Sequence, residues 1–329
     1  MTIKFLFPFL CSFIVSVLAI FFLVRSGRGA KNLKKRFGGS VVILVFALLV
    51  LLNRDLVITK PIVGILVGGL LILLFGLWDD FKNINWKWQL IFQVIIAITT
   101  ISFGVQSGYI NNPFGGVINL ESPVILYTAY TIYFLMFINA INWFDGIDGL
   151  SGSVTLMALA LIFFLSLLPH VNQPATAILC TIAGGAILGF LVFNWHLAKI
   201  IAGTSGAWFF GFILASLSIF AGAKIATVLM AALIPVLDLA RVIWERYRAG
   251  QSVFSGGDNR HLHHKLLKLG LREKQIVVLI CIMNLIVGLA ALNLNALGKL
   301  IFVFVFSLGY FILQNFKFQI SNEFSIFKF

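Results

Sequence analysis

Polar residues suited to holding a phosphate or a cation are concentrated in one short stretch of an otherwise apolar chain. Residues 139–151 read NAINWFDGIDGLS and lie between two long apolar runs. Asn139 and Asn142 are three residues apart, and the same spacing recurs in Asp145 and Asp148. The glycine after each aspartate lets the backbone turn sharply and approach a ligand closely. A phosphate or nucleotide fits such a surface once a cation neutralises the carboxylates, whereas a simple hydrophilic turn would not need four spaced amides and acids.

A pair of adjacent carboxylates, Asp79 and Asp80, ends an earlier apolar run directly after Trp78. Adjacent carboxylates repel each other, so the pair suits a cation, or a proton acceptor held beside one. A solvated helix end with an interfacial tryptophan is the alternative, and it would suffice for a single aspartate. The pair favours a functional role.

A basic, imidazole-rich segment lies much later, where residues 258–264 read DNRHLHH. Arg260, His261, His263 and His264 can hold a diphosphate through charge-assisted hydrogen bonds. A zinc site is the runner-up, because H-x-H-H is compact and hard to wrap around one ion. A basic loop that touches anionic lipid headgroups is the third interpretation.

The elements that carry these groups must be membrane helices. The 329 residues are 60% hydrophobic and 11% charged, against about 25% charged in soluble proteins. The three cysteines lie in apolar runs without C-x-x-C spacing, which argues against a disulfide or a zinc site built on them. We therefore expect an all-α polytopic membrane protein, with one transmembrane domain over residues 1–329, the lipid bilayer as its surroundings and no nucleic-acid partner. The first apolar run is expected to be a retained helix.

Apolar runs of about 20 residues, the length that spans a bilayer, recur along the chain and predict eleven helices. A short hairpin is expected on the outer surface near 107–122, where alternating apolar residues surround Asn-Pro and Gly-Gly. The expected helices are 4–24, 40–58, 61–77, 88–106, 123–141, 152–169, 175–193, 207–222, 224–244, 276–294 and 297–315. The expected cytoplasmic connections are 25–39, 78–87, 142–151, 194–206 and 245–275.

The charges predict the orientation of these helices. With the N-terminus outside, the Lys and Arg residues that fall outside are only Lys4, Arg54, Lys60, Lys224 and Lys299 of the 24 in the chain. Cytoplasmic segments carry an excess of Lys and Arg, so we expect the N-terminus outside and the C-terminus in the cytoplasm. The acids played no part in this choice, yet only Asp55 and Glu121 fall outside. This asymmetry predicts one active site on the cytoplasmic face.

Taken in order, these motifs resemble the polyprenyl-phosphate N-acetylhexosamine-1-phosphate transferase family, glycosyltransferase family 4. The resemblance covers roughly residues 25–270 and is specific through the order and spacing of the motifs. The matching stretches are RFGG at 36–39, DD at 79–80, NAINWFDGIDGL at 139–150, IPVLD ending at Asp238, and DNRHLHH at 258–264. The HLHH form and the eleven expected helices resemble the undecaprenyl-phosphate GlcNAc-1-phosphate transferase branch more than the related phospho-N-acetylmuramoyl-pentapeptide translocases.

The resemblance implies transfer of N-acetylhexosamine-1-phosphate from a UDP-N-acetylhexosamine, with UDP-GlcNAc favoured, to a polyprenyl (undecaprenyl) phosphate. UMP is released, as the first membrane step of cell-envelope glycan synthesis. Mg²⁺ is the implied cofactor, with Mn²⁺ as an alternative, and the implied location is the plasma (inner) membrane. A homodimer is left open. By the family pattern Asp79 and Asp80 are catalytic and engage the acceptor phosphate, and Asn142 helps to hold the metal. The residues implied to bind the nucleotide, diphosphate or sugar are Asn139, Asp145, Asp148, Arg260, His261, His263 and His264.

One segment departs from the family pattern. Residues 203–207 read GTSGA where the family usually has G-D-x-G-S, so Thr204 occupies the metal-binding position of an aspartate. A neutral hydroxyl is a poorer ligand for a hard cation. Three alternatives follow: Asn142 and nearby carboxylates hold the metal, the chain uses the metal differently, or the chain is inactive. The presence of the other acidic residues of the motifs favours a working variant. The first inside loop keeps only Asn32, Arg36 and the glycine pair of a longer family pattern.

A secondary transporter or flippase is the competing class of function. Such proteins usually place charges near the membrane midplane, on broken helices in repeated halves. Here the acids lie at helix ends on one face, and the sequence shows no internal repeat. The transferase is therefore the favoured function.

Overall fold

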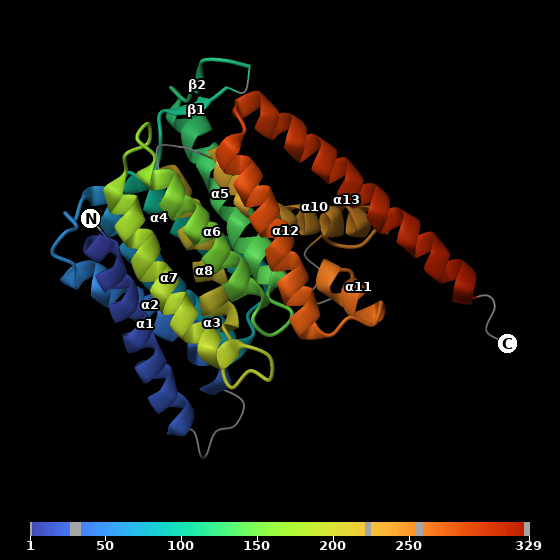
Figure 1. The fold of residues 1–329 in the computed structure, drawn as a ribbon, viewed down its shortest axis with the longest axis horizontal. Coiled ribbons are helices and arrows are strands. Elements are labelled where there is room, and N and C mark those ends of the chain that lie inside the picture. The colour runs from blue at the N-terminus through green and yellow to red at the C-terminus, as the bar shows by residue number, and fades with distance from the viewer. Residues whose placement is uncertain (1, 27–33, 113, 221–224, 254–258, 326–329) are drawn as a thin grey trace.

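The computed structural model describes residues 2–26, 34–112, 114–220, 225–253 and 259–325, so Asn32 and Asp258 of the predicted motifs lie outside the described residues. The described chain is helical apart from one hairpin and the connecting turns (Figure 1). In chain order its elements are α1 (Thr2–Arg25), η1 (Lys34–Phe37), α2 (Gly38–Leu52), α3 (Lys60–Lys82), α4 (Trp86–Ser102), β1 (Tyr109–Asn111), β2 (Val117–Asn119), α5 (Pro123–Phe144), α6 (Leu150–Leu167), α7 (Pro174–Asn194), α8 (Gly203–Phe220), α9 (Ile225–Ala231), α10 (Leu233–Arg248), α11 (Leu262–Lys268), α12 (Glu273–Asn293) and α13 (Ala296–Ser325).

The helices have the length and composition of a membrane protein. Within the described segments, seven helices are long and apolar enough to cross a bilayer, and Gly38–Leu52 and Ala296–Ile312 are shorter apolar helices. Ten of the eleven predicted ranges each coincide with one of the observed helices. The protein is therefore a polytopic, almost entirely helical membrane protein.

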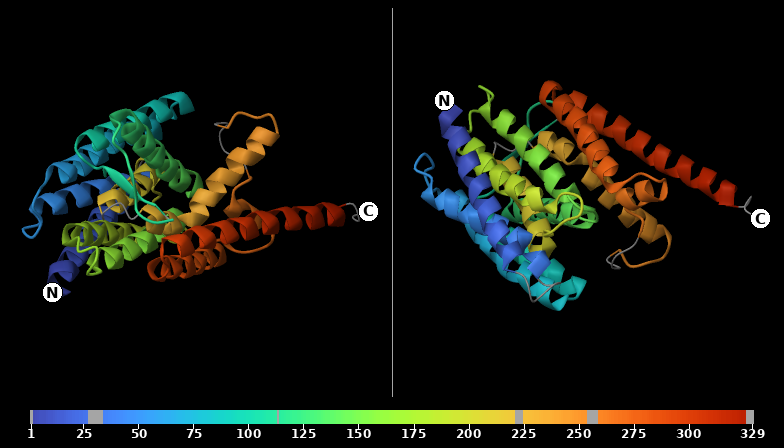
Figure 2. Two further views of the ribbon diagram at one scale, coloured as in Figure 1. Left: turned by 90° about the horizontal axis from the view of Figure 1, so that it is seen from above. Right: turned by 60° about the horizontal axis from the view of Figure 1, so that its bottom comes forward.

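The predicted single helix at 224–244 is corrected by the structure. Two helices, α9 and α10, lie there and are separated at Ala232. Asp238, Arg241 and Glu245 lie three, then four residues apart on one face of α10, and lipid cannot solvate such a face. Figure 2 shows α10 and α13 leaving the helix bundle in different directions. The polar face of α10 is turned toward other protein segments, because Asp238 accepts from Leu262 N and Arg241 donates to Arg260 O.

Helices α7 and α8 form the centre of the bundle, and most of their residues are buried. α7 packs against α1 through small residues: a Cβ on Gly185 would lie 2.0 Å from Ser12 Oγ. Ser16 Oγ also donates to Ala186 O at 2.9 Å across the same contact. Membrane helices associate through such close packing of small residues, because lipid gives them no hydrophobic drive to associate. The central helices thus provide a rigid support for the loops at their ends.

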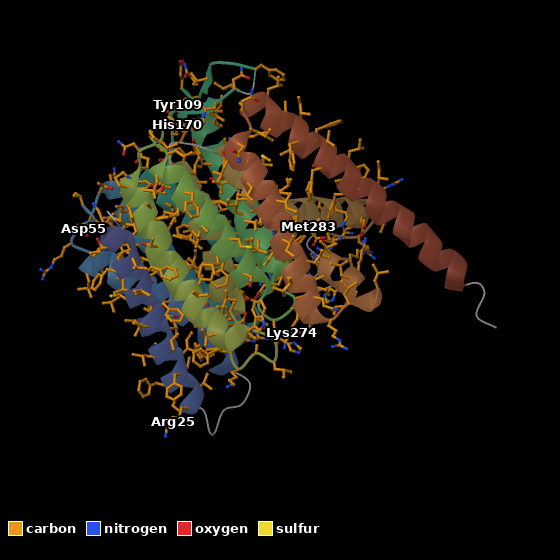
Figure 3. All side chains as sticks on the ribbon, in the orientation of Figure 1. Arg25, Asp55, Tyr109, His170, Lys274 and Met283 are labelled. Atoms are coloured by element: carbon orange, nitrogen blue, oxygen red, sulfur yellow. The ribbon has the colours of Figure 1, made fainter. Side chains whose placement is uncertain are left out.

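The predicted hairpin is present. β1 and β2 pair antiparallel, with Ile110 opposite Ile118. Tyr109 of the hairpin and Asp55, both predicted outside, lie toward one end of the bundle, whereas Arg25 and Lys274, both predicted inside, lie toward the other (Figure 3). The two ends of the bundle therefore carry the segments that the charge pattern assigned to opposite faces.

Candidate active site

Asp80 lies in the last turn of α3, is buried, and faces the first turn of α8. Its carboxylate accepts hydrogen bonds from Thr204 N at 2.8 Å, from Ser205 N at 3.3 Å and from Ser205 Oγ at 3.2 Å. The first amides of a helix lack partners within the helix and favour an anion. Asp80 therefore caps α8 from a position far away in the sequence.

Asp79 has a separate set of donors. Its Oδ1 accepts from Ile84 N and from Gln89 Nε2, both at 2.9 Å, and its Oδ2 accepts from Thr204 Oγ1 at 2.6 Å. Each of the four carboxylate oxygens of the pair thus accepts at least one hydrogen bond. Thr204 contributes a hydrogen-bond donor to the pair rather than a third negative charge.

Gly203 is required at the junction between α3 and α8. Its φ is +70°, and a Cβ at this position would lie 2.5 Å from Arg36 O and 2.7 Å from Asp80 Oδ2. Both the backbone conformation and the available space therefore exclude a side chain.

We expect Gly203→Ala to destabilise the protein more than Gly250→Ala. The left-handed φ, +70° at Gly203 and +66° at Gly250, costs either alanine about 1–2 kcal/mol. Gly250, however, has nothing within 4 Å of an added Cβ, so only Gly203→Ala must also displace its neighbours. Thermal unfolding of both variants in one detergent measures the difference; equal shifts would contradict the tight junction.

The glycine pair of RFGG holds the start of α2 against this junction. Gly38 N donates to Ile201 O at 3.2 Å, and Gly39 N donates to Ala202 O at 3.0 Å. A Cβ on Gly39 would lie 2.0 Å from Gly206 Cα. The glycines are therefore a packing surface for α8, while Arg36 Nη1 donates to Asn83 Oδ1 at 3.3 Å just after the aspartate pair.

The acidic turn that follows α5 is held by side chains and backbone from α6 and the end of α7. Ser151 Oγ donates a short hydrogen bond to Asp145 Oδ1, and Ala198 N donates to Asp148 Oδ2 at 2.9 Å. Gly149 has a left-handed φ of +79°, as expected for a turn glycine, and its N–H donates to Asn194 Oδ1 at 3.0 Å. The second oxygen of each aspartate accepts no hydrogen bond from the described residues.

The two asparagines of the motif have different surroundings. Asn142 lies in the last turn of α5, where its backbone carbonyl oxygen accepts a hydrogen bond from Asp145 N at 3.3 Å. Asn139 lies one turn earlier, and its Nδ2 donates to Gln93 Oε1 on α4 at 2.7 Å and to Leu135 O at 2.8 Å. Both amide protons of Asn139 are thus committed, one to α4 and one to the backbone of its own helix.

Burial raises the pKa of Asp145 to about 6, although the hydrogen bond from Ser151 lowers it. The negative charges of Asp148 and Asp80 raise it further. Asp80 and Asp145 are therefore close enough to interact electrostatically.

We expect Ser151→Ala to move the acidic limb of the kcat/KM profile to higher pH. The variant removes the donor that stabilises the ionised carboxylate of Asp145, so protonation begins at a higher pH. Ser151→Thr, which keeps a hydroxyl, is the control and should leave the limb near pH 6. A limb that is unchanged in Ser151→Ala would show that Asp145 is not the titrating group.

His263 is buried against the acidic turn. A Cβ on Gly146 would lie 2.0 Å from His263 Nε2, and the ring meets Phe144 edge-on at 6.1 Å. Neither ring nitrogen has a hydrogen-bond partner among the described residues. Burial, with a smaller contribution from His264, lowers the pKa of His263 to about 3, so the ring is neutral at pH 7.

The remaining residues of the histidine segment lie around α10. His261 Nδ1 contacts Asp238 Oδ2 at 2.8 Å, the ring of His264 is 4.3 Å from that of His263, and Arg260 Nη2 donates to Gln251 Oε1 at 2.6 Å. Burial raises the pKa of Asp238, but the His261 hydrogen bond and the positive charge of Arg241 outweigh it and lower the pKa overall.

The three predicted motifs therefore lie close enough to influence one another. Asp80 acts on the charge of Asp145, Gly146 lies against His263, and Trp143 meets the ring of His261 edge-on at 6.0 Å. The arrangement brings acceptor and acid groups together with imidazoles at the ends of α3, α5 and α8. It can hold phosphate groups where an apolar helix bundle meets water.

Several residues of this region have no counterpart in the motifs. Gln89 and Gln93 were recognisable as polar residues four apart in an apolar helix, and Arg241 and Glu245 as charges on the face that carries Asp238. Ser205 and Ser151 carry no such signal, because serine is common at helix starts. Only the packing of the helices identifies their partners.

Known proteins are similar in sequence to most of this chain. The model of the family described as Glycosyl transferase family 4 matches residues 62–222. A decaprenyl-phosphate N-acetylglucosaminephosphotransferase of Mycobacterium leprae is 32% identical over 254 residues, which cover 70% of this chain and 63% of that protein. The protein of the same name from Mycolicibacterium smegmatis is 31% identical over 268 residues, which cover 74% of this chain and 66% of that protein. The chain thus spans less than two thirds of the length of either relative. On the matched motifs and these relatives, the chain belongs to glycosyl transferase family 4, the polyprenyl-phosphate N-acetylhexosamine-1-phosphate transferase family that its sequence resembles.

Proposed function

We propose that the protein transfers N-acetylhexosamine-1-phosphate, with N-acetylglucosamine the favoured sugar, from a UDP-sugar to a polyprenyl phosphate and releases UMP. The observation that carries the proposal is the junction of Asp80, Asp145 and His263, which come from three distant motifs and meet at one end of the bundle. The names of the relatives support the sugar and the class of acceptor. The reaction would be the first membrane step of cell-envelope glycan synthesis.

The proposed reaction is a displacement at phosphorus. An oxygen of the acceptor phosphate attacks the β-phosphorus of the UDP-sugar, and the bond from that phosphorus to the bridging oxygen breaks. The electron pair of this bond leaves with UMP. The chain supplies a fixed polar surface at the end of apolar helices, where a lipid-borne phosphate and a water-soluble nucleotide can meet. Preorganised donors and charges of this kind are the main source of catalysis in phosphoryl transfer.

The aspartate pair and the acidic turn have different roles in this proposal. Asp79 and Asp80, already surrounded by donors, shape and charge the acceptor side. Asp145 and Asp148 each offer one carboxylate oxygen that accepts no hydrogen bond from the described residues. Arg260, His261 and His264 hold the diphosphate or the sugar, whereas the neutral ring of His263 supports the turn.

The acidic turn fits Mg²⁺, and the aspartate pair does not. Each oxygen of the pair already accepts a hydrogen bond, whereas Asp145, Asp148 and Asn142 present hard oxygen ligands. Within the described residues no three His, Cys, Asp or Glu side chains are grouped to hold a metal. Mg²⁺ is commonly held by one or two carboxylates together with substrate phosphates, and there it would neutralise the diphosphate. Thr204 is then a hydrogen-bond donor to Asp79 rather than a metal ligand.

We propose the plasma membrane as the location and its cytoplasmic face as the side of the active site. If successive helices cross the membrane in alternate directions, most Lys and Arg residues lie in the segments on the inside. This excess supports the orientation. The aspartate pair ends α3 and the acidic turn follows α5, and both helices begin at the end of the bundle that carries Asp55 and the hairpin.

The proposal is tested with purified protein, UDP-GlcNAc, undecaprenyl phosphate and Mg²⁺. UMP release that requires the lipid phosphate, with formation of a lipid-linked sugar diphosphate, is the expected result. A panel of UDP-GalNAc and deoxy-sugar analogues then defines the sugar. UMP release without acceptor would indicate a hydrolase, and uptake of substrate into vesicles without UMP release would indicate a transporter.

A further inference from the structure

Asp238 is the most densely hydrogen-bonded side chain of the α10 region, and it is 1% exposed. Its Oδ1 accepts from Arg241 Nη2 at 2.7 Å, from Leu262 N at 3.0 Å and from Tyr310 OH at 3.2 Å. Its Oδ2 meets His261 Nδ1 at 2.8 Å. Four donors on a buried carboxylate favour its ionised, acceptor-only form.

The contact with Asp238 determines the protonation of the His261 ring. An ionised carboxylate has no proton to give, so His261 Nδ1 must carry the hydrogen of this bond. Nε2 is then the only ring nitrogen left for a ligand, and it takes part in no hydrogen bond with the described residues. The ring lies parallel to that of His263, at 5.7 Å and 5°, and edge-on to Trp143, which directly precedes the acidic turn.

The two carboxylate oxygens of Asp238 have separable duties. Oδ1 takes three donors, one from Arg241 within α10 and two that join α10 to α11 and α13, whereas Oδ2 accepts from His261 alone among the described residues. If Asp238 only joined the helices together, it would not need to keep one oxygen for a ring nitrogen. With its hydrogen on Nδ1, the neutral ring presents Nε2 as a hydrogen-bond acceptor.

We propose that Asp238 is a positioning residue for the transfer reaction: it holds His261 in the form protonated at Nδ1 and reserves Nε2 to accept a hydrogen bond from a hydroxyl of the donor sugar. This inference rests on the proposed function. Asp238 itself does not touch the substrate and acts through the imidazole. The ring keeps its hydrogen on Nδ1 throughout the reaction and neither takes up nor gives up a proton.

Asp238→Asn separates positioning from structure. The amide oxygen can keep the three donors of Oδ1, which places the amide NH₂ opposite His261. Nδ1 must then accept a hydrogen bond, and the hydrogen of the neutral ring moves to Nε2. The substitution is nearly isosteric, so it reverses the tautomer and removes the charge beside it.

The first test is ¹⁵N NMR of protein labelled in its five histidine rings, in lipid nanodiscs, with the His261 signals assigned by their loss in His261→Gln. We expect Nδ1 of His261 to be protonated in the wild type and unprotonated in Asp238→Asn. Tyr310→Phe, which removes one donor from Oδ1 only, should leave Nδ1 protonated. A ring that keeps its Nδ1 hydrogen in Asp238→Asn overturns the proposal.

The second test is kinetic. We expect Asp238→Asn to lower kcat for UMP release about 100-fold or more while KM for the UDP-sugar changes less than about threefold, as for other imidazoles that lose a carboxylate partner. In a His261→Gln background the same substitution should have almost no further effect, because the two residues act as a unit. Additive losses in the double variant would assign Asp238 a structural role alone.

Asp238→Glu keeps the charge, and it is the test variant if Asp238→Asn does not fold. It should retain the hydrogen on Nδ1 and lose less than about tenfold in kcat; loss of that hydrogen would contradict the proposal. The NMR result does not depend on turnover. Absence of UMP release by the wild type would overturn the proposed function, and the NMR spectra would still decide whether Asp238 controls the His261 ring.

Discussion

Asp80→Asn is expected to lower kcat/KM for UMP release by about a thousandfold, within the range seen for catalytic acid and base groups. The substitution removes a buried negative charge from the start of α8. It also leaves an amide NH₂ opposite a backbone or hydroxyl donor, because Thr204 N lies at one oxygen of Asp80 and Ser205 N and Oγ lie at the other. The charge that acts on Asp145 disappears as well. Initial rates with varied lipid phosphate and varied UDP-sugar measure the loss.

Ser205→Ala is the matched control for this prediction. It removes the hydroxyl donor at 3.2 Å and keeps both backbone donors to Asp80. We expect a loss below about tenfold, because a long hydrogen bond of this kind contributes about 1 kcal/mol. If Asp80→Asn keeps more than a tenth of the wild-type activity while it remains folded, Asp80 lies outside the catalytic machinery.

Thr204→Asp is expected to be about 3 kcal/mol less stable than the wild type when divalent cations are chelated, because it adds a half-buried, uncompensated charge beside two buried carboxylates. Thr204 Oγ1 lies 2.6 Å from Asp79 Oδ2 and the Thr204 amide binds Asp80, so a carboxylate there joins two others. Mg²⁺ should restore the stability of Thr204→Asp by neutralising the three charges. In the wild type the hydroxyl already satisfies Asp79, so Mg²⁺ should shift its thermal unfolding much less.

Thr204→Asn has the shape of aspartate without its charge and isolates the electrostatic part. Its stability should be the same in EDTA and in Mg²⁺. Thermal unfolding of the three proteins in both solutions measures the effect. Equal stability of Thr204→Asp and Thr204→Asn in EDTA would mean that the aspartate pair is not a negatively charged site, and it would remove the physical basis for the role given to Thr204.

The sequence was sufficient for the positions of most helices and for the motifs that meet at the site. A chain in lipid must satisfy its backbone hydrogen bonds internally, so long apolar runs can only become helices. The turn at Gly149 and the hairpin near 107–122 also followed from local residue chemistry, because glycine permits a left-handed backbone and Asn-Pro favours a turn. The metal, the orientation and the role of each site residue remain predictions.

Other features depend on how the helices rotate and pack, and local sequence does not specify that. The break at Ala232 follows from the polar face of α10. Asn139 pairs with Gln93, His263 is buried against Gly146, and Thr204 donates to Asp79 because separate helices bring these groups together. Spacing along one helix defines a face but not what that face meets. Hydrogen bonds between distant helices, which set the charge and protonation of the site, are therefore properties of the tertiary structure.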